Sequence, residues 1–403
     1  MSKSTNFSGQ PILNQLLMFL DKGQIRKLSK ENHGDRYVKK FCTYNHVVVM
    51  LFVALEGYQS IREVIVGLLA NAHKLGHLGL NYLVRRSTLS EANQRRSSRL
   101  FGAVYMEVYR RNRGSLADSR LSDTDMKRLY IMDSTTITLF KDILKGVGRN
   151  PQQGKKKGGI KAHTIIKASE NVPCLIRYSA AVRHDHTFLK EIHTLPKGSI
   201  ITFDKGYVDY AQYEAFSQSS IWYVTRLKDN AVYDARKEYD LPDGVPSGIL
   251  KDEEIVLYYG ENKRQEHRTR RIAYWDSENE RLFEFISNNM ELSAEKIALI
   301  YKQRWQIELL FKQLKHNFPL KYFLGDNENA IEIQIWAAML ANLLITLVKG
   351  KVKKAWAFSN MVSLIRNQLM SYVDIYRFLE NPEGCWRKIT AEDERRYQHS
   401  LFD

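Results

Sequence analysis

Residues 301–315, YKQRWQIELLFKQLK, carry the pattern that most constrains how this chain folds. Arg304, Glu308 and Lys315 follow Tyr301 at offsets of three, seven and fourteen residues. At about 100° per residue, these offsets place all four side chains on one narrow stripe of a helix. Apolar residues recur beside the stripe at spacings of three and four, which predicts that the helix docks on a core. The charged stripe is therefore expected at the edge of a packed domain.

Two acidic residues stand inside or at the end of strand-like runs. Asp133 lies in RLYIMDSTTITLF, and Asp204 follows the apolar residues of SIITFD. Aspartate is unfavourable in an apolar strand, so both positions need a physical reason. One reason is coordination of a divalent cation. The other, for Asp204 followed by Lys205 and Gly206, is capping of the next segment.

The elements around these residues have the order β-β-β-α-β-α-β. After the strand of Asp133, periodicity and turn residues predict a hairpin, a short helix, a strand, a second helix and a last strand. Their ranges are 161–169 and 172–181, 187–195, 199–204, 210–217, and 221–227. With the helix of Glu308 added, this α/β order is that of a ribonuclease-H-like catalytic core.

A β-rich insertion is predicted between the two halves of this core. The interval from Asp204 to Glu308 is longer than the core elements require, and residues 253–260, 269–277 and 281–289 read as strands. The predicted organisation is a helical N-terminal domain, a first core part, the insertion, a second core part and a C-terminal helical region. The corresponding ranges are 1–120, 121–227, 228–290, 291–350 and 351–403.

These motifs resemble those of DDE transposases of bacterial insertion sequences, in the insertion sequence four family. Tyr301, Arg304, Glu308 and Lys315 match the Y-x2-R-x3-E-x6-K signature at every spacing. YIMDSTTI and FDKGYVDY match the two acidic motifs, and the helical N-terminal part is also similar, so the likeness covers nearly the whole chain. It implies an enzyme that cuts DNA at the ends of an insertion sequence and joins the 3′-hydroxyl ends to target DNA.

The chemistry of such a reaction agrees with the residue types. In-line displacement at phosphorus requires charge stabilisation on both the attacking and the leaving oxygen, which two divalent ions held by carboxylates supply. We therefore expect Asp133, Asp204 and Glu308 to be catalytic and to bind two ions of Mg²⁺ or Mn²⁺. The resemblance implies that Tyr301, Arg304 and Lys315 bind phosphates.

Three further residues are candidates for DNA contact. Relatives with such an insertion stack an extruded base on a Trp, for which Trp275 is the first candidate; the alternative is a Trp packed in the insertion's own core. Lys161 follows the basic segment 155–157 and is a candidate backbone contact. His163 is either a phosphate contact or a polar strand residue.

Charge favours a nucleic-acid partner. Sixty-one Lys and Arg against 45 Asp and Glu give a formal charge of +16, typical of an electrostatic DNA footprint. Arg85, Arg86, Arg95, Arg96 and Arg99 in the N-terminal part belong either to a structural domain or to a surface that recognises the element's terminal repeats.

Composition also sets the expected compartment. Three scattered cysteines predict no zinc site, and no apolar run reaches the length of a membrane span, so a cytoplasmic protein without membrane contacts is expected. Cutting two ends together predicts a homodimer on DNA. Two alternatives stay open: a ribonuclease-H-like nuclease or resolvase without strand transfer, and a non-catalytic DNA-end-binding protein.

Overall fold

The computed structural model describes residues 9–117, 122–138, 148–149, 157–180, 185–241 and 248–384. The chain forms two compact units. One combines Met1–Leu116 with Gln313–Asp403, and the other is Ala117–Lys312. The predicted basic segment 155–157 falls largely outside the described residues, as does the end of the predicted C-terminal region, 385–403.

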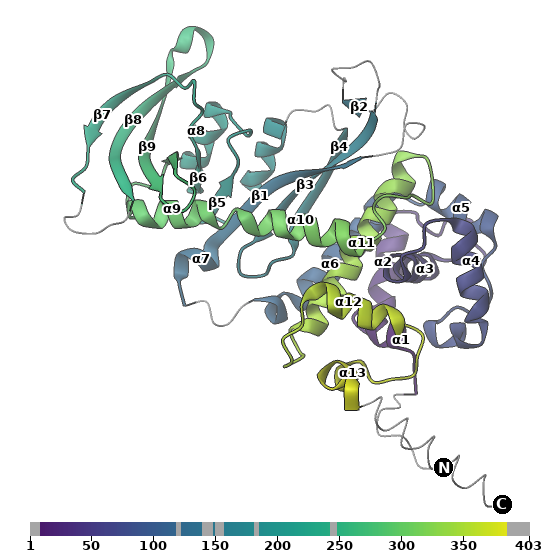
Figure 1. The fold of residues 1–403 in the computed structure, drawn as a ribbon. Helices are drawn as coiled ribbons and strands as arrows, with labels where there is room; N and C mark the ends of the chain where they lie inside the picture. Colours follow the sequence, from purple (N-terminus) through teal and green to yellow (C-terminus); the bar gives the residue numbers. More distant parts are fainter. Residues whose placement is uncertain are drawn as a thin grey trace, which may run out of the picture. The chain divides into compact units, whose positions relative to one another are not determined.

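The unit Ala117–Lys312 is built on one mixed sheet, which has ten strands among the described residues (Figure 1). Its strands are β1 (Leu129–Thr138), β2 (Gly148–Arg149), β3 (Lys157–Lys167), β4 (Pro173–Ala180), β5 (Ile200–Phe203), β6 (Trp222–Arg226), β7 (Tyr233–Glu238), β8 (Ile249–Tyr259), β9 (Gln265–Asp276) and β10 (Arg281–Ser287). Its helices are α7 (Thr124–Arg128), η2 (Asp185–Thr194), α8 (Tyr210–Gln218), η3 (Glu261–Lys263), α9 (Ala294–Lys302) and the first part of α10 (Trp305–Asn317).

The strand order confirms the predicted succession of elements. β4, β3 and β1 are antiparallel neighbours, and β5 and β6 add to the other side of β1 in parallel. The predicted short helix at 187–195 is present as the 3-10 helix η2.

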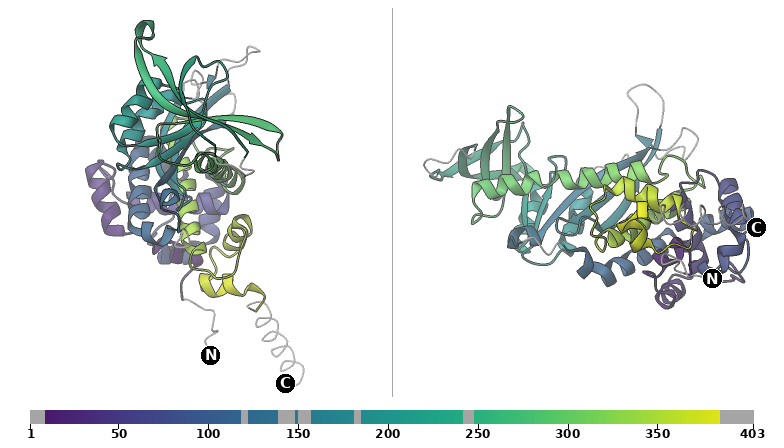
Figure 2. Two further views of the ribbon diagram at one scale, coloured as in Figure 1. Left: turned by 90° about the vertical axis from the view of Figure 1, so that its left-hand side faces the viewer. Right: turned by 60° about the horizontal axis from the view of Figure 1, so that its bottom comes forward.

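The insertion strands continue the same sheet. β10 pairs with β6, and β9, β8 and β7 follow in antiparallel order. The long insertion strands, coloured teal to green, are seen from two further directions in Figure 2. The three predicted insertion strands are found as β8, β9 and β10. The edge strand β7 has no apolar alternation and was not predicted, because almost all its residues are exposed.

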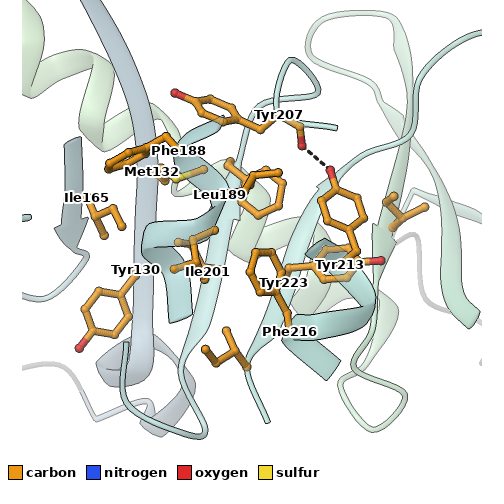
Figure 3. Close-up of a cluster of buried hydrophobic side chains, with 14 of the residues drawn as sticks. Tyr130, Met132, Ile165, Phe188, Leu189, Ile201, Tyr207, Tyr213, Phe216 and Tyr223 are labelled. Atoms are coloured by element: carbon orange, nitrogen blue, oxygen red, sulfur yellow. Dashed lines mark hydrogen bonds between the residues drawn. The ribbon is translucent and has the colours of Figure 1, made fainter. Parts of the chain in front are cut away.

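The two faces of the sheet carry different residues. Met132 of β1 pairs with Phe203 of β5, and both belong to a buried cluster. Figure 3 shows Met132 in this cluster with Tyr213 and Phe216 of α8. We call this side the α8 face. Because side chains alternate along a strand, the residues next to Met132 and Phe203 point to the other side, against which α9 packs. We call this second side the α9 face.

The other unit is helical. It contains α1 (Ile12–Leu17), α2 (Lys22–Glu31), α3 (Thr43–Glu56), α4 (Ile61–Ala70), η1 (Ala72–Leu78), α5 (Arg86–Arg95), α6 (Ser98–Leu116), the end of α10, α11 (Glu328–Lys349), α12 (Phe358–Asn367) and α13 (Ile375–Glu380). α3 is buried from Thr43 to Leu55 and ends at Gly57, whose φ of +84° suits glycine. α11 packs against α3 and α6.

This arrangement differs from the predicted boundaries. Residues from Gln313 onward cluster with the N-terminal helices, whereas the prediction placed 291–350 with the sheet. α11, with 22 residues, is long and apolar enough to cross a membrane, but 89% of its apolar window is buried inside the structure. α11 is thus the central helix of a helical core, and its apolar surface packs against neighbouring helices such as α3 and α6.

Candidate active site

The parallel pairing of β1 and β5 brings the two aspartates together. Met132 pairs with Phe203 in this register. Asp133 is the residue after Met132, and Asp204 is the residue after Phe203. Adjacent strands lie about 4.8 Å apart. Both side chains therefore leave neighbouring positions toward the α9 face, as a shared site requires.

Glu308 reaches the same place from α10. Arg304 donates to Glu308 across 2.5 Å and to Asp133 across 3.4 Å, so one guanidinium bridges the carboxylates of a strand and a helix. The side chains of Arg304 and Asp133 are less than one-fifth exposed, and that of Glu308 is one-third exposed. Strand pairing thus sets Asp204 beside Asp133, and Arg304 links Asp133 to Glu308.

The signature helix is interrupted, which corrects the prediction of one continuous helix. α9 ends at Lys302 and α10 begins at Trp305. Bonds of i to i+3 type bridge the break, from Arg304 N–H to the Tyr301 carbonyl and from Ile307 N–H to the Arg304 carbonyl. This tighter turn places Arg304 between the two helices, where its side chain reaches β1.

Electrostatics at the site follow from burial and like charge. The pKa of Asp133 is raised to about 6, mainly by burial and in smaller part by the charges of Asp204 and Glu308. The Ser134 N–H, at 2.7 Å, and Arg304 act in the opposite direction. A carboxylate that is hard to ionise beside two others is a place where a cation gains much binding energy.

Tyr301 lies beside the carboxylates, more deeply buried than its neighbours in the signature. Its ring contacts Phe285 of β10 at 4.9 Å and lies 5.8 Å from the Arg304 guanidinium. Burial raises the pKa of its phenol, which stays a neutral donor at physiological pH. Lys315 lies seven residues beyond Glu308 on α10, exposed, in the part of that helix that belongs to the helical unit.

Lys161 and His163 belong to the opposite face. In the β1–β3 register they pair with Thr136 and Ser134, whereas Asp133 pairs with Thr164. Paired residues point the same way and neighbours alternate, so both candidates point to the α8 face. His163 is only 2% exposed, bonds Ser179 at 2.8 Å and stacks on Phe188 of η2. These contacts fit the polar strand residue of the two alternatives.

Trp275 also points away from the carboxylates. Phe285 pairs with both Ile272 and Arg226 and contacts Tyr301, so these paired side chains point to the α9 face. Trp275 stands three residues after Ile272. Three residues along a strand reverse the side, so the indole lies on the α8 face. Its ring is 42% exposed, so it is not packed within a core of the insertion either.

Two residues on the correct side were not singled out from the sequence. Arg226 ends β6 beside Asp204, and its guanidinium lies 5.0 Å from the ring of Phe283. Trp305 stands three residues before Glu308 and is 59% exposed. Arg226 could have been predicted from the sequence, because it ends the strand that follows the strand of Asp204. Exposure of Trp305 could not be read from an amphipathic pattern.

The donor set fits a hard divalent cation. Three carboxylates on neighbouring elements are the ligands that Mg²⁺ and Mn²⁺ prefer. Among the residues described, no group of three or more His, Cys, Asp or Glu is close enough to hold an ion. The Arg304 guanidinium lies between Asp133 and Glu308 and forms an ion pair with each.

Comparison with known proteins decides the family. Residues 124–344, more than half of the chain, match the Transposase DDE domain. This chain belongs to that family. Residues 8–81 match a second family, Domain of unknown function (DUF4372). The DDE match spans all three carboxylates of the site and Arg304.

Several curated transposases are similar to the chain. The "Putative transposase y4zB" of Sinorhizobium fredii is 28% identical over 261 residues, 64% of this chain and 70% of that protein. The "Probable transposase for insertion sequence element IS5377" of Geobacillus stearothermophilus is 25% identical, over 60% of this chain and 62% of that one. The "Transposase for insertion sequence element IS231B" of Bacillus thuringiensis is 21% identical, over 57% and 58%. The matches span about six- to seven-tenths of the length of these relatives. That the relatives are transposases, two of them of insertion sequences, agrees with the predicted insertion sequence four family.

Among solved structures, a cryo-EM structure of the piggyBac transposase synaptic complex with hairpin DNA has a TM-score of 0.45 to this chain. The sequence identity is 12%, over 93% of this chain and 82% of that one.

Proposed function

We propose that this DDE transposase cuts DNA at the ends of an insertion sequence and joins the freed 3′-hydroxyl ends to target DNA, on a ribonuclease-H-like core. The observation that carries the proposal is the register of β1 and β5, which sets Asp133 beside Asp204. Arg304 then links Asp133 to Glu308 of α10. Membership of the DDE family supports it. In a bacterium this reaction takes place in the cytoplasm, where the DNA is.

Asp133, Asp204 and Glu308 would hold two divalent ions, Mg²⁺ or Mn²⁺. When bound, such ions supply charge stabilisation for the oxygens that enter and leave phosphorus. The chain's own contribution would be to present the three carboxylates from two neighbouring strands and a helix. This order lowers the reorganisation that the reaction would otherwise require.

The cationic and phenolic groups would hold the DNA strand. Arg304 offers a planar guanidinium suited to a phosphate, and Tyr301 beside it keeps a hydroxyl as a donor. Arg226 adds a second guanidinium next to Asp204. Lys315 further along α10 would contact the backbone. Because both ends of an element are joined in one event, we propose that two copies of the chain act together on DNA.

Substitution of Glu308 tests the proposal. Glu308→Gln keeps the shape of the side chain but removes a charged ligand, so cleavage should fall by roughly a thousandfold or more while binding of end DNA stays nearly unchanged. The matched control is Glu291→Gln, at an exposed position before α9. The assay uses a duplex carrying both ends of the element, with nicked products resolved on denaturing gels and joined products sequenced. Full cutting by Glu308→Gln would remove Glu308 from the site.

The joining step separates this function from its alternatives. A nuclease or resolvase would cut the same duplex without ever linking a 3′-hydroxyl to target DNA. A binding protein without catalysis would hold the ends equally well after Asp133→Ala and would cut in neither form.

A further inference from the structure

The segment from α2 to residue 40 is rich in positive charge. Its nineteen residues, 22–40, contain seven Lys and Arg against two acidic residues. All seven cations are exposed: Lys22, Arg26, Lys27, Lys30, Arg36, Lys39 and Lys40. Ile25, in contrast, is 2% exposed and faces the core. α2 thus presents a polar, cationic side outward and has no apolar face available for a lipid surface.

The loop that follows α2 is held by a polar hub centred on Asp35. The Asp35 carboxylate accepts from the Ser29 hydroxyl at 2.7 Å and from the Thr43 N–H and hydroxyl at 2.7 and 2.9 Å. Arg96, 5% exposed, donates to the Gly34 carbonyl at 3.1 Å and to Asp35 at 3.3 Å. For Arg96 these contacts fit the structural role of the two alternatives, and its side chain fixes the loop against the end of α5.

Two residues of this loop have strained backbones. His33 has a φ of +53° and Tyr37 a φ of +61°, a region that bulky side chains rarely adopt. Tyr37 is also 89% exposed, beside the exposed Val38. The Arg36 guanidinium donates to the Tyr37 hydroxyl at 3.2 Å and lies 5.0 Å from its ring. An aromatic ring that is 89% exposed buries little surface on folding, and on strained backbone this points to contact with a partner.

We propose that α2 and loop 33–40, hereafter the α2 surface, bind the phosphate backbone of duplex DNA next to the element's ends, with Tyr37 as an aromatic contact in a groove. The proposal rests on the proposed function, since it names where that DNA lies. Seven exposed cations suit a polyanion, and the hub makes the loop a rigid display. The surface lies within residues 8–81, so it gives a role to the region that matches a family of unknown function.

Charge removal tests the α2 surface. In the cleavage-deficient Asp133→Asn background, binding is measured by fluorescence anisotropy with an end duplex and with an unrelated duplex. Lys39→Gln/Lys40→Gln should weaken binding at least threefold. It should also reduce the slope of log K against log salt by roughly 0.9 for each lost contact. The matched control, Lys349→Gln/Lys353→Gln, removes the same charge at exposed positions of the same unit and should have a smaller effect.

Tyr37→Asn gives a second, independent readout. Asparagine tolerates a left-handed backbone, so the melting temperature should stay unchanged or rise while DNA affinity falls. Loss of affinity with a lowered melting temperature would instead indicate a folding defect and count against the proposal.

The outcomes distinguish failure of the α2 surface from failure of the proposed function. Wild-type affinity in both the lysine pair and Tyr37→Asn would overturn the α2 surface and leave the proposed function intact. An Asp133→Asn protein that binds the end duplex no better than the unrelated duplex at any salt concentration would count against the proposed function itself.

Discussion

The guanidinium of Arg304 lies 2.5 Å from the carboxylate of Glu308, while the same side chain reaches Asp133 at 3.4 Å. An arginine thus occupies the place between two carboxylates that a divalent cation would require. The two cations cannot satisfy the same oxygens at once. Because Arg304 is also suited to a DNA phosphate, movement of its side chain toward DNA would leave both carboxylates available for metal.

Arg304→Gln should therefore strengthen metal binding in the absence of DNA. Removing the competing cation should increase Mn²⁺ affinity roughly three- to tenfold, measured by isothermal titration calorimetry on the protein alone. Cleavage should fall, since the phosphate contact is lost. The control is Arg281→Gln, an exposed arginine on β10. Equal metal affinity in the wild type and Arg304→Gln would show that the bridge does not compete with metal.

Trp275→Ala should leave cleavage within about twofold of wild type. The indole lies on the α8 face, opposite the carboxylates, and substitution at a site 42% exposed removes little packing. Arg226→Gln is the comparison, because this residue lies beside Asp204 on the α9 face, and it should slow cleavage. Both rates are measured on the same end duplex. A severe defect in Trp275→Ala with an intact fold would restore the base-stacking role expected from the resemblance.

The sequence predicted the elements of the sheet better than the direction of their side chains. Asp133 and Asp204 were recognisable because a charged residue in an apolar strand is unfavourable without a purpose. Which side Lys161, His163 or Trp275 points to depends on strand register, and register is set by pairing between distant segments. A shift of one residue would have reversed every side, and no local pattern fixes it.

The break before Trp305 and the grouping of α11 were also unpredictable for physical reasons. Gln303 and Arg304 are both good helix formers, so nothing local announces that the helix stops there. α11 is apolar on all sides, which predicts burial but not whether the partner is a sheet or a set of helices. Its packing on α3 and α6 is a tertiary outcome.

His46 should make the stability of the helical unit sensitive to acid. Its side chain is fully buried, and burial, together with the charge of Arg96, lowers its pKa to about 3. The unfolded imidazole, with a pKa of about 6.5, binds the proton more readily than the folded one. The stabilising contribution is therefore complete above pH 6.5 and is lost as pH falls from there toward 3, by at most about 1.4 kcal/mol per pH unit.

His46→Gln measures this contribution. The free energy of unfolding in urea should depend less on pH in the variant than in the wild type between pH 7.5 and 5, even though the variant is less stable at pH 7.5. The exposed His73→Gln provides the control. Parallel pH profiles for wild type and His46→Gln would show that His46 is not the group responsible.

Two glycines of α6 offer a matched test of how closely this helix packs on α11. A Cβ at Gly102 would come within 2.8 Å of the Trp336 ring, whereas a Cβ at Gly114 meets no described atom within 4 Å. Gly102→Ala should therefore lower the free energy of unfolding by about 1–3 kcal/mol through overpacking against a rigid ring. Gly114→Ala should raise it by about 0.5–1 kcal/mol through better helix propensity. Thermal unfolding followed by circular dichroism compares the two variants directly. If both alanines stabilise the protein alike, the indole of Trp336 does not lie against Gly102.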